Sequence, residues 1–412
     1  MAIESLKCKE CGASYDLGAH FACENCFGPL EVAYDYSDLD PDEVKRRIQA
    51  GSQGIWRYAD FLPFVGRPGD PLEPGFTPLL RADRLAERLG LDAELWVKND
   101  AANPTHSFKD RVVAVAVAKA RELGFTTVAC ASTGNLANAV AAHSAAAGLA
   151  SYVFVPANLE EQKLLATGVY GTHLVGVRGN YDDVNRLCTQ LAETHPSWAF
   201  VNVNIRPYYA EGSKTLAYET AEQLGWELPD RVVCPIASGS LFTKVGRGFQ
   251  EWLDLGLVSG AQPVFNGAQA EGCSPVATAF AEGWEICKPQ KPDTIAKSLA
   301  IGDPADGPYA LEQARNTGGA IDSVSDDEIR DGILLLAETT GIFTETAGGV
   351  TVAVLAKLAE RGDIGSGERV VVYITGEGLK TLDATRDTFH MHEIDPDLDS
   401  FESEFEQQEV VA

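Results

Sequence analysis

The sequence feature that most constrains the fold is a repeated alternation of short apolar runs with longer helical segments from residue 94 onward. Glu94–Asp100 and Thr126–Ser132 have the composition of buried strands, and Arg111–Gly124 between them is typical of a helix that ends at a glycine. Six further runs of the strand type follow along the chain: SYVFVP, HLVGVRG, WAFVNVN, RVVCPIAS, PVFNGAQAEG and RVVVYITGEG. Strands that are apolar along their whole length belong to parallel sheets covered on both faces. The sequence therefore predicts an α/β protein with two open, mainly parallel sheets, helices on both faces of each and a cleft between them.

Four of the nine cysteines form two Cys-x-x-Cys pairs near the start of the chain, at Cys8, Cys11, Cys23 and Cys26. Two such pairs joined by a short loop can direct four thiolates toward the corners of a tetrahedron, which is the geometry of a closed structural Zn²⁺ site. The segment is too short to bury a core, so a bound metal would supply its folding energy. Two disulfides or a coincidence are the alternatives, and the five remaining cysteines are expected in the core. We expect a zinc ribbon with a structural role.

The chain carries 60 acidic and 33 basic residues, which gives a formal net charge of −27. Such a surface repels nucleic-acid phosphates, so we expect no nucleic-acid partner. Two interpretations of the charge stay open: a surface that favours solubility, and adaptation to high salt, where counter-ions screen the repulsion. Arginine outnumbers lysine, which favours the halophilic interpretation. The sequence has no run near the ~20 apolar residues of a membrane span and no signal-peptide pattern, so we expect a cytoplasmic protein without a membrane partner.

Four turns rich in glycine, serine or proline occur where predicted strands give way to helices. They are Asn103–Arg111 (NPTHSFKDR), Ala131–Asn135 (ASTGN), Ala237–Leu241 (ASGSL) and Thr375–Lys380 (TGEGLK). In open α/β sheets, ligands bind beyond the carboxyl ends of the strands, where backbone N–H groups and helix N-termini can hold an anion. Each turn taken alone is more often ordinary loop structure. Their combination with Lys109, a lysine on the entry turn of an apolar helix, indicates covalent amine chemistry in a cleft.

These motifs, together with GNYDDVNRL from Gly179 onward, resemble those of the fold-type II pyridoxal-phosphate enzymes, whose fold is like that of the tryptophan synthase β subunit. The resemblance runs from Thr77 to Asp383. The stretches Gly179–Asp183 and Glu211–Thr215 narrow it to the threonine synthases of the shorter, archaeal and bacterial type. It implies a lyase that converts O-phospho-L-homoserine and water to L-threonine and phosphate by γ-elimination and β-addition.

The resemblance also implies roles for individual residues. Lys109 would form the Schiff base with pyridoxal 5′-phosphate, Asn135 would bond the 3′-oxygen of its ring, and the Thr375 hydroxyl would face the ring nitrogen. The cofactor phosphate would be held by Ser238, Gly239, Ser240, Leu241 and Thr243, and the substrate carboxylate by Ser132 and Thr133. A lysine must be uncharged to attack an aldehyde, and an apolar cleft favours the uncharged form.

The leaving phosphate of the substrate needs a cationic pocket of its own, although each candidate taken alone is more often a surface or packing residue. The candidates are Lys98, Lys163, Asn202, Asn204, Arg206 and Lys214. Three stretches depart from the family pattern. His106 stands where the motif usually has glycine, as a pocket contact or a space-filling side chain; ASGSL replaces a glycine-richer phosphate loop; and NVNIRPYYAEG (Asn202–Gly212) differs from the usual NSxNPxRxEG.

The altered Asn202–Gly212 stretch leaves the substrate open. A β-replacing relative such as a cysteate synthase and a threonine/serine dehydratase are the alternatives within the fold, and a zinc-ribbon binding module with an idle α/β body is the alternative outside it. Cofactor enzymes of this architecture are often two-fold dimers, so we expect a homodimer. The expected parts are a zinc ribbon at 1–35, a large catalytic α/β domain at 36–105 and 180–390, a small α/β domain at 106–179 and an acidic tail at 391–412.

Overall fold

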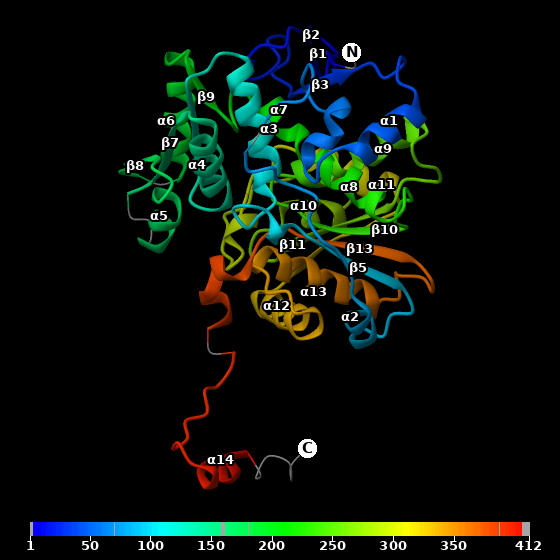
Figure 1. Cartoon of the computed structure of the whole chain (residues 1–412), viewed down its shortest axis with the longest axis vertical. Coiled ribbons are helices and arrows are strands. Elements are labelled where there is room, and N and C mark those ends of the chain that lie inside the picture. The colour runs from blue at the N-terminus through cyan, green and yellow to red at the C-terminus, as the bar shows by residue number, and fades with distance from the viewer. Residues whose placement is uncertain (1–2, 70, 158–160, 180, 387, 406–412) are drawn as a thin grey trace.

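The computed structural model describes residues 3–69, 71–157, 161–179, 181–386 and 388–405, without the side chains of residues 161–163, 181 and 182. Within these residues it contains a small antiparallel sheet near the N-terminus, a six-stranded sheet and a four-stranded sheet. Figure 1 shows the four-stranded sheet and its helices on one side of the molecule, the six-stranded sheet on the other, and α3 (Lys109–Glu122) between the two. The predicted fold class is confirmed, because both large sheets are mainly parallel and helices cover both of their faces.

The six-stranded sheet has the order β12-β11-β10-β13-β5-β4, and β4 at its edge runs antiparallel to β5. Its strands are β4 (Leu79–Arg81), β5 (Glu94–Asn99), β10 (Arg231–Pro235), β11 (Val264–Ala270), β12 (Ile321–Val324) and β13 (Arg369–Ile374). The valine run of β13 alternates between two cores, since Val371 packs into one while Val370 and Val372 pack into the other. The first core is covered by α8 (Lys214–Gln223), α9 (Ser240–Leu255) and α11 (Gly307–Asn316), and the second by α2 (Asp83–Arg88), α12 (Asp326–Thr340) and α13 (Thr346–Glu360).

The four-stranded sheet is parallel throughout and has the order β8-β7-β6-β9. Its strands are β6 (Thr127–Ala131), β7 (Ala150–Pro156), β8 (His173–Val177) and β9 (Trp198–Phe200). Helix α4 (Asn135–Ala147) covers the face that carries Cys130, and α6 (Tyr181–Thr194) covers the face that carries Ala129. The many alanines of α4 allow α3 to pack closely behind it, so the N-termini of both helices are held by one rigid unit.

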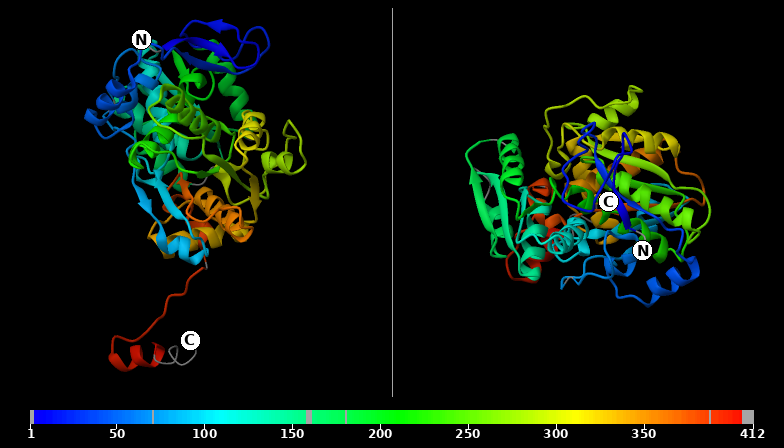
Figure 2. Two further views of the ribbon diagram at one scale, coloured as in Figure 1. Left: turned by 90° about the vertical axis from the view of Figure 1, so that its right-hand side faces the viewer. Right: turned by 90° about the horizontal axis from the view of Figure 1, so that it is seen from above.

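The N-terminal ribbon consists of β1 (Ile3–Cys8), β2 (Ser14–Tyr15) and β3 (Leu30–Tyr34) in the order β2-β1-β3. It lies at the top of the molecule in Figure 1, and the side view in Figure 2 shows it over the body rather than apart from it. It contacts α7 (Arg206–Glu211) through two hydrogen bonds. The Tyr208 hydroxyl donates to Gly18 O (2.9 Å), and the Tyr34 hydroxyl donates to Glu211 Oε2 (2.8 Å). The ribbon is therefore docked on a helix that also packs against α3.

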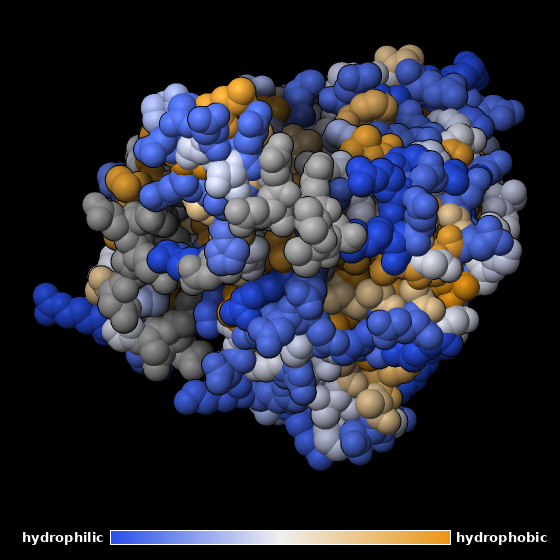
Figure 3. Space-filling view, turned by 90° about the horizontal axis from the view of Figure 1, so that it is seen from below, coloured by the Kyte–Doolittle hydropathy of each residue, from blue (hydrophilic) through white to orange (hydrophobic). Residues whose placement is uncertain are grey.

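The remaining elements are short or peripheral. They are α1 (Pro41–Ala50), η1 (Ile55–Phe61), η2 (Asp100–Ala102), α5 (Glu161–Gly168), α10 (Pro275–Ala281), η3 (Lys297–Leu299), η4 (Gly378–Thr385) and α14 (Leu398–Phe405). After η4 the chain leaves the body and ends in α14, which lies well away from the body in Figures 1 and 2. Among the described residues, every helix is too short or too polar to cross a membrane. The face drawn in Figure 3 is dominated by hydrophilic residues, as the net charge of −27 requires.

The strands expected from the sequence in the two large sheets are present, although one is shorter than expected. Two further strands of the six-stranded sheet were not expected. The run WAFVNVN gives only β9, because Asn204 closes a turn behind it: Asn204 Oδ1 accepts from Phe200 N (2.8 Å), and its Nδ2 donates to Trp198 O (3.1 Å). The short strands β4 and β12 were not expected. Strand β9 lies beyond residue 179 and yet pairs with β6, so the small sheet extends past the expected end of the small domain; the domain boundaries themselves stay a prediction.

Candidate active site

Lys109 is the first residue of α3, and the loop before it is fixed at both ends. At one end, Asn103 accepts a hydrogen bond at Oδ1 from Gly75 N (2.9 Å). At the other end, Phe108 N donates to Thr375 O (2.8 Å), just past the end of β13. The lysine is therefore presented beyond the carboxyl ends of β5 and β13, where ligands of such sheets bind.

The amine of Lys109 is half-buried among aromatic rings. Its Nζ lies 5.6 Å from the centroid of the Phe108 ring and 5.9 Å from that of the Tyr209 ring. His106, in the same loop, is exposed and has φ +61°, in the left-handed region that favours glycine. This backbone conformation accounts for the glycine that the family motif usually has at that position.

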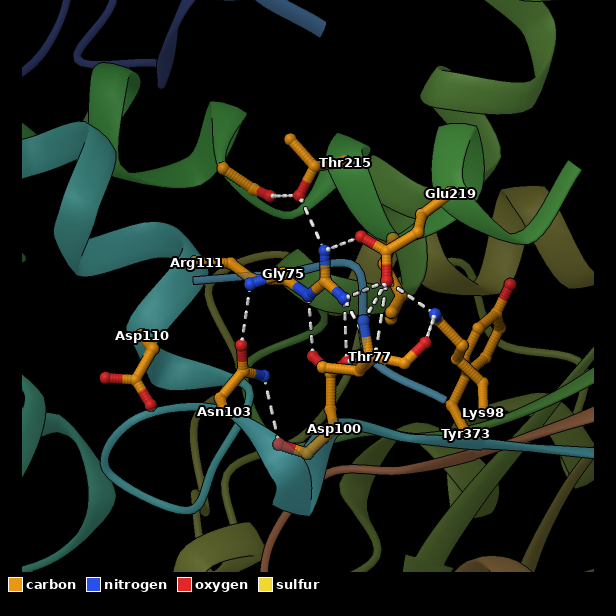
Figure 4. A network of polar contacts seen from close by, with 12 residues as sticks. Gly75, Thr77, Lys98, Asp100, Asn103, Asp110, Arg111, Thr215, Glu219 and Tyr373 are labelled. Atoms are coloured by element: carbon orange, nitrogen blue, oxygen red, sulfur yellow. Dashed lines mark hydrogen bonds and ion pairs between the residues drawn. The ribbon is translucent and has the colours of Figure 1, made fainter. Parts of the chain in front are cut away.

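A closed network of buried charges lies beneath the loop (Figure 4). Arg111, two residues after Lys109, donates to both carboxylate oxygens of Asp100 (2.7 and 2.8 Å) and to both of Glu219 (2.8 Å each). Lys98 forms an ion pair with the same Glu219, and all four side chains are at most 2% exposed. The two cations match the two carboxylates, so the network ties α3 to β5 and α8 without an unpaired buried charge.

The position of Lys98 decides what it can bind. Its ammonium donates to Glu219, to Thr77 O (2.6 Å) and to Gln223 Oε1 (2.7 Å), which uses its three donors. Although burial alone would raise the pKa of Glu219, Arg111 and Lys98 hold that pKa well below its usual range. The contacts of Lys98 are thus those of a structural ion pair and give no support to the predicted role in holding a substrate phosphate.

A second buried carboxylate fixes the loop to the small sheet. Asp110 accepts from Thr105 N (2.9 Å), from the Thr105 hydroxyl (2.9 Å) and from His143 Nε2 (2.9 Å) on α4. Asp110 and His143 are both fully buried. The loop that presents Lys109 is thus anchored to both sheets.

Across the site, Asn135 and Thr375 meet at a carboxylate that sequence reasoning did not identify. Asn135, the first residue of α4, donates from Nδ2 to both oxygens of Glu345 (3.1 and 2.9 Å). The Thr375 hydroxyl lies 3.5 Å from Glu345 Oε1. Lys380 donates to Asn135 Oδ1 (2.8 Å) and to Thr105 O (2.6 Å). Burial raises the pKa of Glu345, and Lys380 and Lys109 oppose that shift as nearby positive charges.

The sequence carried a signal for one of these two residues. Lys380 lies in the TGEGLK turn, five residues after Thr375, and only Thr375 was predicted to bind the cofactor. Glu345 directly precedes the small-residue helix α13, and an acidic residue before a helix is more often a simple cap. Nothing local distinguishes it, because its partners are Thr375, just past the end of β13, and Asn135 at the start of α4.

The expected phosphate loop is a tight turn that leads into the N-terminus of α9. Gly239 has φ +99° and precedes the N-terminus of α9, and a Cβ there would come within 2.8 Å of Asp306 O. Asp306 N donates to Ser238 O (2.8 Å), which closes the loop against α11. The first N–H groups of α9, from Ser240 and Leu241 onward, point out of the helix end as all such groups do. The Thr243 hydroxyl donates to Gly239 O (3.1 Å) and so faces the helix backbone.

The predicted carboxylate contacts, Ser132 and Thr133, lie half-buried between β6 and the start of α4, next to Asn135. The predicted phosphate-binding residues are less uniform. Arg206 forms an ion pair with Asp306 (2.8 Å) and is 35% exposed, whereas Lys214 is fully buried between Glu211 and Glu251. The side chain of Lys163 lies outside the described residues, as does Asn180 of the GNYDD motif.

The two asparagines of the altered stretch differ in how they are bonded. The side-chain oxygen and nitrogen of Asn204 are both hydrogen-bonded to the backbone of the turn behind β9. Asn202 Oδ1 is buried and has no hydrogen-bond partner among the described residues. A buried amide without partners is costly unless a ligand or water completes it, so Asn202 stays the better candidate of the two.

The four ribbon cysteines converge. Their sulfur atoms all lie within 4.8 Å of one another, with Cys8 Sγ to Cys26 Sγ and Cys11 Sγ to Cys23 Sγ both 3.5 Å. Four thiolates about a tetrahedral Zn²⁺ with bonds of about 2.3 Å would be about 3.8 Å apart. All four are free thiols, so the disulfide alternative is not realised. The cluster fits a four-thiolate metal site, as expected from the sequence.

Comparison with known proteins agrees with this geometry. Residues 71–376 match the family described as "Pyridoxal-phosphate dependent enzyme". The chain is 38% identical to the threonine synthase of Methanocaldococcus jannaschii over 382 residues, 92% of this chain and 93% of the relative. It is 40% identical to the threonine synthase of Methanosarcina acetivorans over 378 residues, 91% of this chain and 92% of the relative.

Solved structures confirm the fold at lower identity. The processed form of threonine deaminase isoform 2 from Solanum lycopersicum superposes with a TM-score of 0.65 at 21% identity, and covers 84% of this chain and 88% of its own. Maize serine racemase gives a TM-score of 0.62 at 18% identity, and covers 82% of this chain and 93% of its own. The resemblance expected from the motifs is thus confirmed: the chain belongs to the pyridoxal-phosphate-dependent enzymes and, within them, to the threonine synthase family.

Proposed function

We propose that this protein converts O-phospho-L-homoserine and water to L-threonine and phosphate, with pyridoxal phosphate as its cofactor. The observation that carries the proposal is the meeting of Lys109, Asn135 and Thr375, from three separate segments, around one buried carboxylate. The identity of 38–40% to threonine synthases over more than nine-tenths of the chain supports the substrate assignment.

The residues present suit the cofactor. Lys109 would hold its aldehyde carbon, Asn135 its 3′-oxygen, Thr375 its ring nitrogen, and the Ser238–Leu241 turn its phosphate. The Thr243 hydroxyl donates to Gly239 O and would support that turn. Glycine at 239 lets this turn adopt φ +99° and pack against the Asp306 backbone, which places the turn at the N-terminus of α9, where an anion can be bound. When bound, the cofactor supplies the electron sink for the carbanion chemistry.

The protein's own part is to bind the substrate and to move protons. The N–H groups at the start of α4, with Ser132 and Thr133, would hold the substrate carboxylate. Lys109, displaced from the cofactor, would take the proton from the substrate Cα and return it later, as general base and then general acid. The rings of Phe108 and Tyr209 lie beside the amine and limit the directions from which it can be approached.

The leaving phosphate would be met by Arg206, with Asn202 as a second donor. Of the candidate cations whose side chains are described, Lys98 and Lys214 are fully buried in ion pairs, and Arg206 is the partly exposed one. Its pairing with Asp306 would have to open when a phosphate group arrives. A phosphate group offers more oxygens to a guanidinium than a carboxylate does, which favours this exchange.

The test compares phosphate release from O-phosphohomoserine and O-phosphoserine by the reconstituted enzyme, with threonine quantified as the product. We expect threonine from the first substrate alone. A Lys109→Ala variant should lose at least about 10³-fold in rate and the borohydride-sensitive absorbance of the bound cofactor. Sulfite-dependent turnover of O-phosphoserine would instead assign a β-replacing enzyme, and turnover of threonine itself a dehydratase.

We also propose that the four-cysteine cluster holds one structural Zn²⁺, that the protein works as a homodimer, and that its acidic surface is an adaptation to high salt. The sulfur separations support the metal site, and the excess of 27 negative charges supports the adaptation to high salt. Sedimentation at several KCl concentrations tests the dimer, and loss of structure at low salt tests the adaptation.

A further inference from the structure

Lys380 is a half-buried lysine whose ammonium contacts two neutral oxygens across the site. It extends from η4 and donates to Thr105 O (2.6 Å) in the loop before Lys109 and to Asn135 Oδ1 (2.8 Å) at the start of α4. These two acceptors belong to segments on opposite sides of the candidate cofactor site. Partial burial costs the ammonium part of its hydration, and its two bonded partners are neutral. The role of Lys380 is therefore to be sought in fixing the position of these partners.

The contact decides which end of the Asn135 amide faces the site. A side-chain amide has an acceptor end and a donor end, and these exchange when the group turns over. An ammonium can only donate, so Oδ1 must face Lys380 and Nδ2 must face the other way. On that other side Nδ2 donates to both oxygens of Glu345 (3.1 and 2.9 Å). Asn135 therefore presents a donor, which is what an anionic 3′-oxygen of the cofactor requires.

The carboxylate that faces this donor is itself fixed. Glu345 is 3% exposed, and a Cβ on Gly376 would come within 2.4 Å of Glu345 Oε1. The glycine of the Thr375–Lys380 turn thus leaves the space in which the carboxylate lies. The same carboxylate lies 3.5 Å from the Thr375 hydroxyl, so both donors expected to meet the cofactor ring converge on it. Lys380 on one side and Glu345 on the other leave the amide a single orientation.

We propose that Lys380 is a positioning residue for the cofactor, which acts through Asn135 by holding the amide with its NH₂ group toward the ring. This rests on the proposed function, because it takes pyridoxal phosphate to be the group that Asn135 meets. The ammonium itself bonds the protein rather than the reacting atoms.

The experiment measures the dissociation constant of pyridoxal phosphate by titration of the cofactor-free protein, together with the melting temperature of that form. Lys380→Met should weaken binding about tenfold or more, as expected for loss of a hydrogen bond to a charged group. Asn135→Ala should weaken binding similarly. The double variant should bind at most about threefold more weakly than Asn135→Ala, because the two substitutions remove the same interaction. Lys357→Met is the matched control. Lys357 lies in the last turn of α13, away from the open site, where it also donates to a backbone carbonyl (Ser323 O, 2.9 Å) and forms an ion pair with Glu328.

Asn135→Asp gives a test that does not depend on how Lys380→Met folds. The substituted carboxylate would keep the shape of the amide and the contact with Lys380 but present an oxygen to the cofactor, so affinity should fall at least about tenfold. Unchanged affinity in this variant or in Lys380→Met, or effects of Lys380→Met and Asn135→Ala that multiply in the double variant, would overturn the proposal. If the wild-type protein binds no pyridoxal phosphate, the proposed function fails instead.

Discussion

Two clusters of charged side chains meet the same short stretch of chain around Lys109, and they differ in how their charges are matched. In the closed cluster, Lys98 and Arg111 face Asp100 and Glu219, two cations against two carboxylates. In the open cluster, defined as Lys109, Asn135, Glu345, Thr375 and Lys380, two lysines and two neutral side chains surround one carboxylate.

This difference in charge matching is visible in the pKa shifts of the two buried glutamates, one in each cluster. Glu219 and Glu345 are both buried, yet the pKa of Glu219 is held far below its usual range while burial raises the pKa of Glu345. Bidentate contact with Arg111 stabilises the ionised form of the first, and the second has only amide and hydroxyl donors within hydrogen-bond distance. A closed cluster can only hold the backbone. In the open cluster Lys109 has no hydrogen-bond or ion-pair partner among the described residues, so the cluster can still accept an anionic molecule, in a protein whose overall charge would repel one.

The largest expected effect comes from the ribbon, which rests on another set of matched charges: Lys214 and Lys244 with Glu211 and Glu251. Removal of the proposed Zn²⁺ should unfold the ribbon, because the apparent binding free energy of structural zinc in small peptides is about 10–16 kcal/mol. The cofactor dissociation constant should change less than about tenfold. The open cluster makes no contact with the ribbon among the described residues, although Lys9 and Glu31 of the ribbon border the turn expected to hold the cofactor phosphate.

Limited proteolysis with and without a chelator measures the unfolding, and zinc analysis of Cys11→Ser identifies the ligands. Cys287→Ser serves as control, because Cys287 lies outside the ribbon and should leave the zinc content unchanged. Loss of cofactor affinity in step with zinc would show that the ribbon supports the open cluster and would break the comparison.

The next largest effect is expected in the closed cluster. Arg111→Met leaves Asp100 and Glu219 buried with Lys98 as the remaining cation, and should lower the free energy of unfolding by about 3–5 kcal/mol. Urea unfolding of the cofactor-free protein measures this. Arg361→Met is the control: Arg361 pairs with Asp322 at the surface, and its removal should cost about 1 kcal/mol or less. A loss as small for Arg111 as for Arg361 would contradict a supporting role for the closed cluster.

Glutamine at each buried glutamate should give opposite results. The pKa of Glu219 is lowered on folding, so its stabilisation is fully present above the unfolded value and is lost as pH falls through the folded one; Glu219→Gln should destabilise at pH 7 by about 2–3 kcal/mol. The pKa of Glu345 is raised on folding, so its ionised form opposes folding above that pKa. Glu345→Gln should stabilise the cofactor-free protein at pH 7 by about 1 kcal/mol.

The pH dependence sharpens this test. The Glu345→Gln difference should shrink as the pH is lowered, because Glu345 becomes protonated, whereas the Glu219→Gln difference should stay constant down to the ordinary glutamate pKa of 4.5. Urea unfolding between pH 4.5 and 8 measures them. Effects of the same sign at pH 7 would mean that the two carboxylates are in equivalent surroundings.

The features that the sequence predicted and those that it missed differ in how far apart the interacting residues lie along the chain. The alternation of apolar strands and helices predicted both sheets, and the position of Lys109, Asn135 and Thr375 next to strand ends predicted that they would lie in the cleft between the sheets. These features are local or follow from the parallel topology. Lys98 was a poor candidate because its burial depends on Glu219, which is 121 residues away in the chain. Glu345 was missed for the same reason, since Asn135, its partner, is 210 residues away.

The smallest expected effect concerns His106, where backbone and side chain can be separated. Because φ is +61°, a glycine relieves strain that any side chain imposes, and His106→Gly should be about 1 kcal/mol more stable than His106→Ala. The two variants lack the imidazole equally, so a change in KM shared by both reports on the ring alone. If the exposed ring only fills space, KM stays at the wild-type value in both variants, and thermal unfolding alone distinguishes them. A stability difference of the opposite sign would mean that the loop relaxes out of the left-handed conformation, and Lys109 would then be presented by a softer loop than the closed cluster beneath it implies.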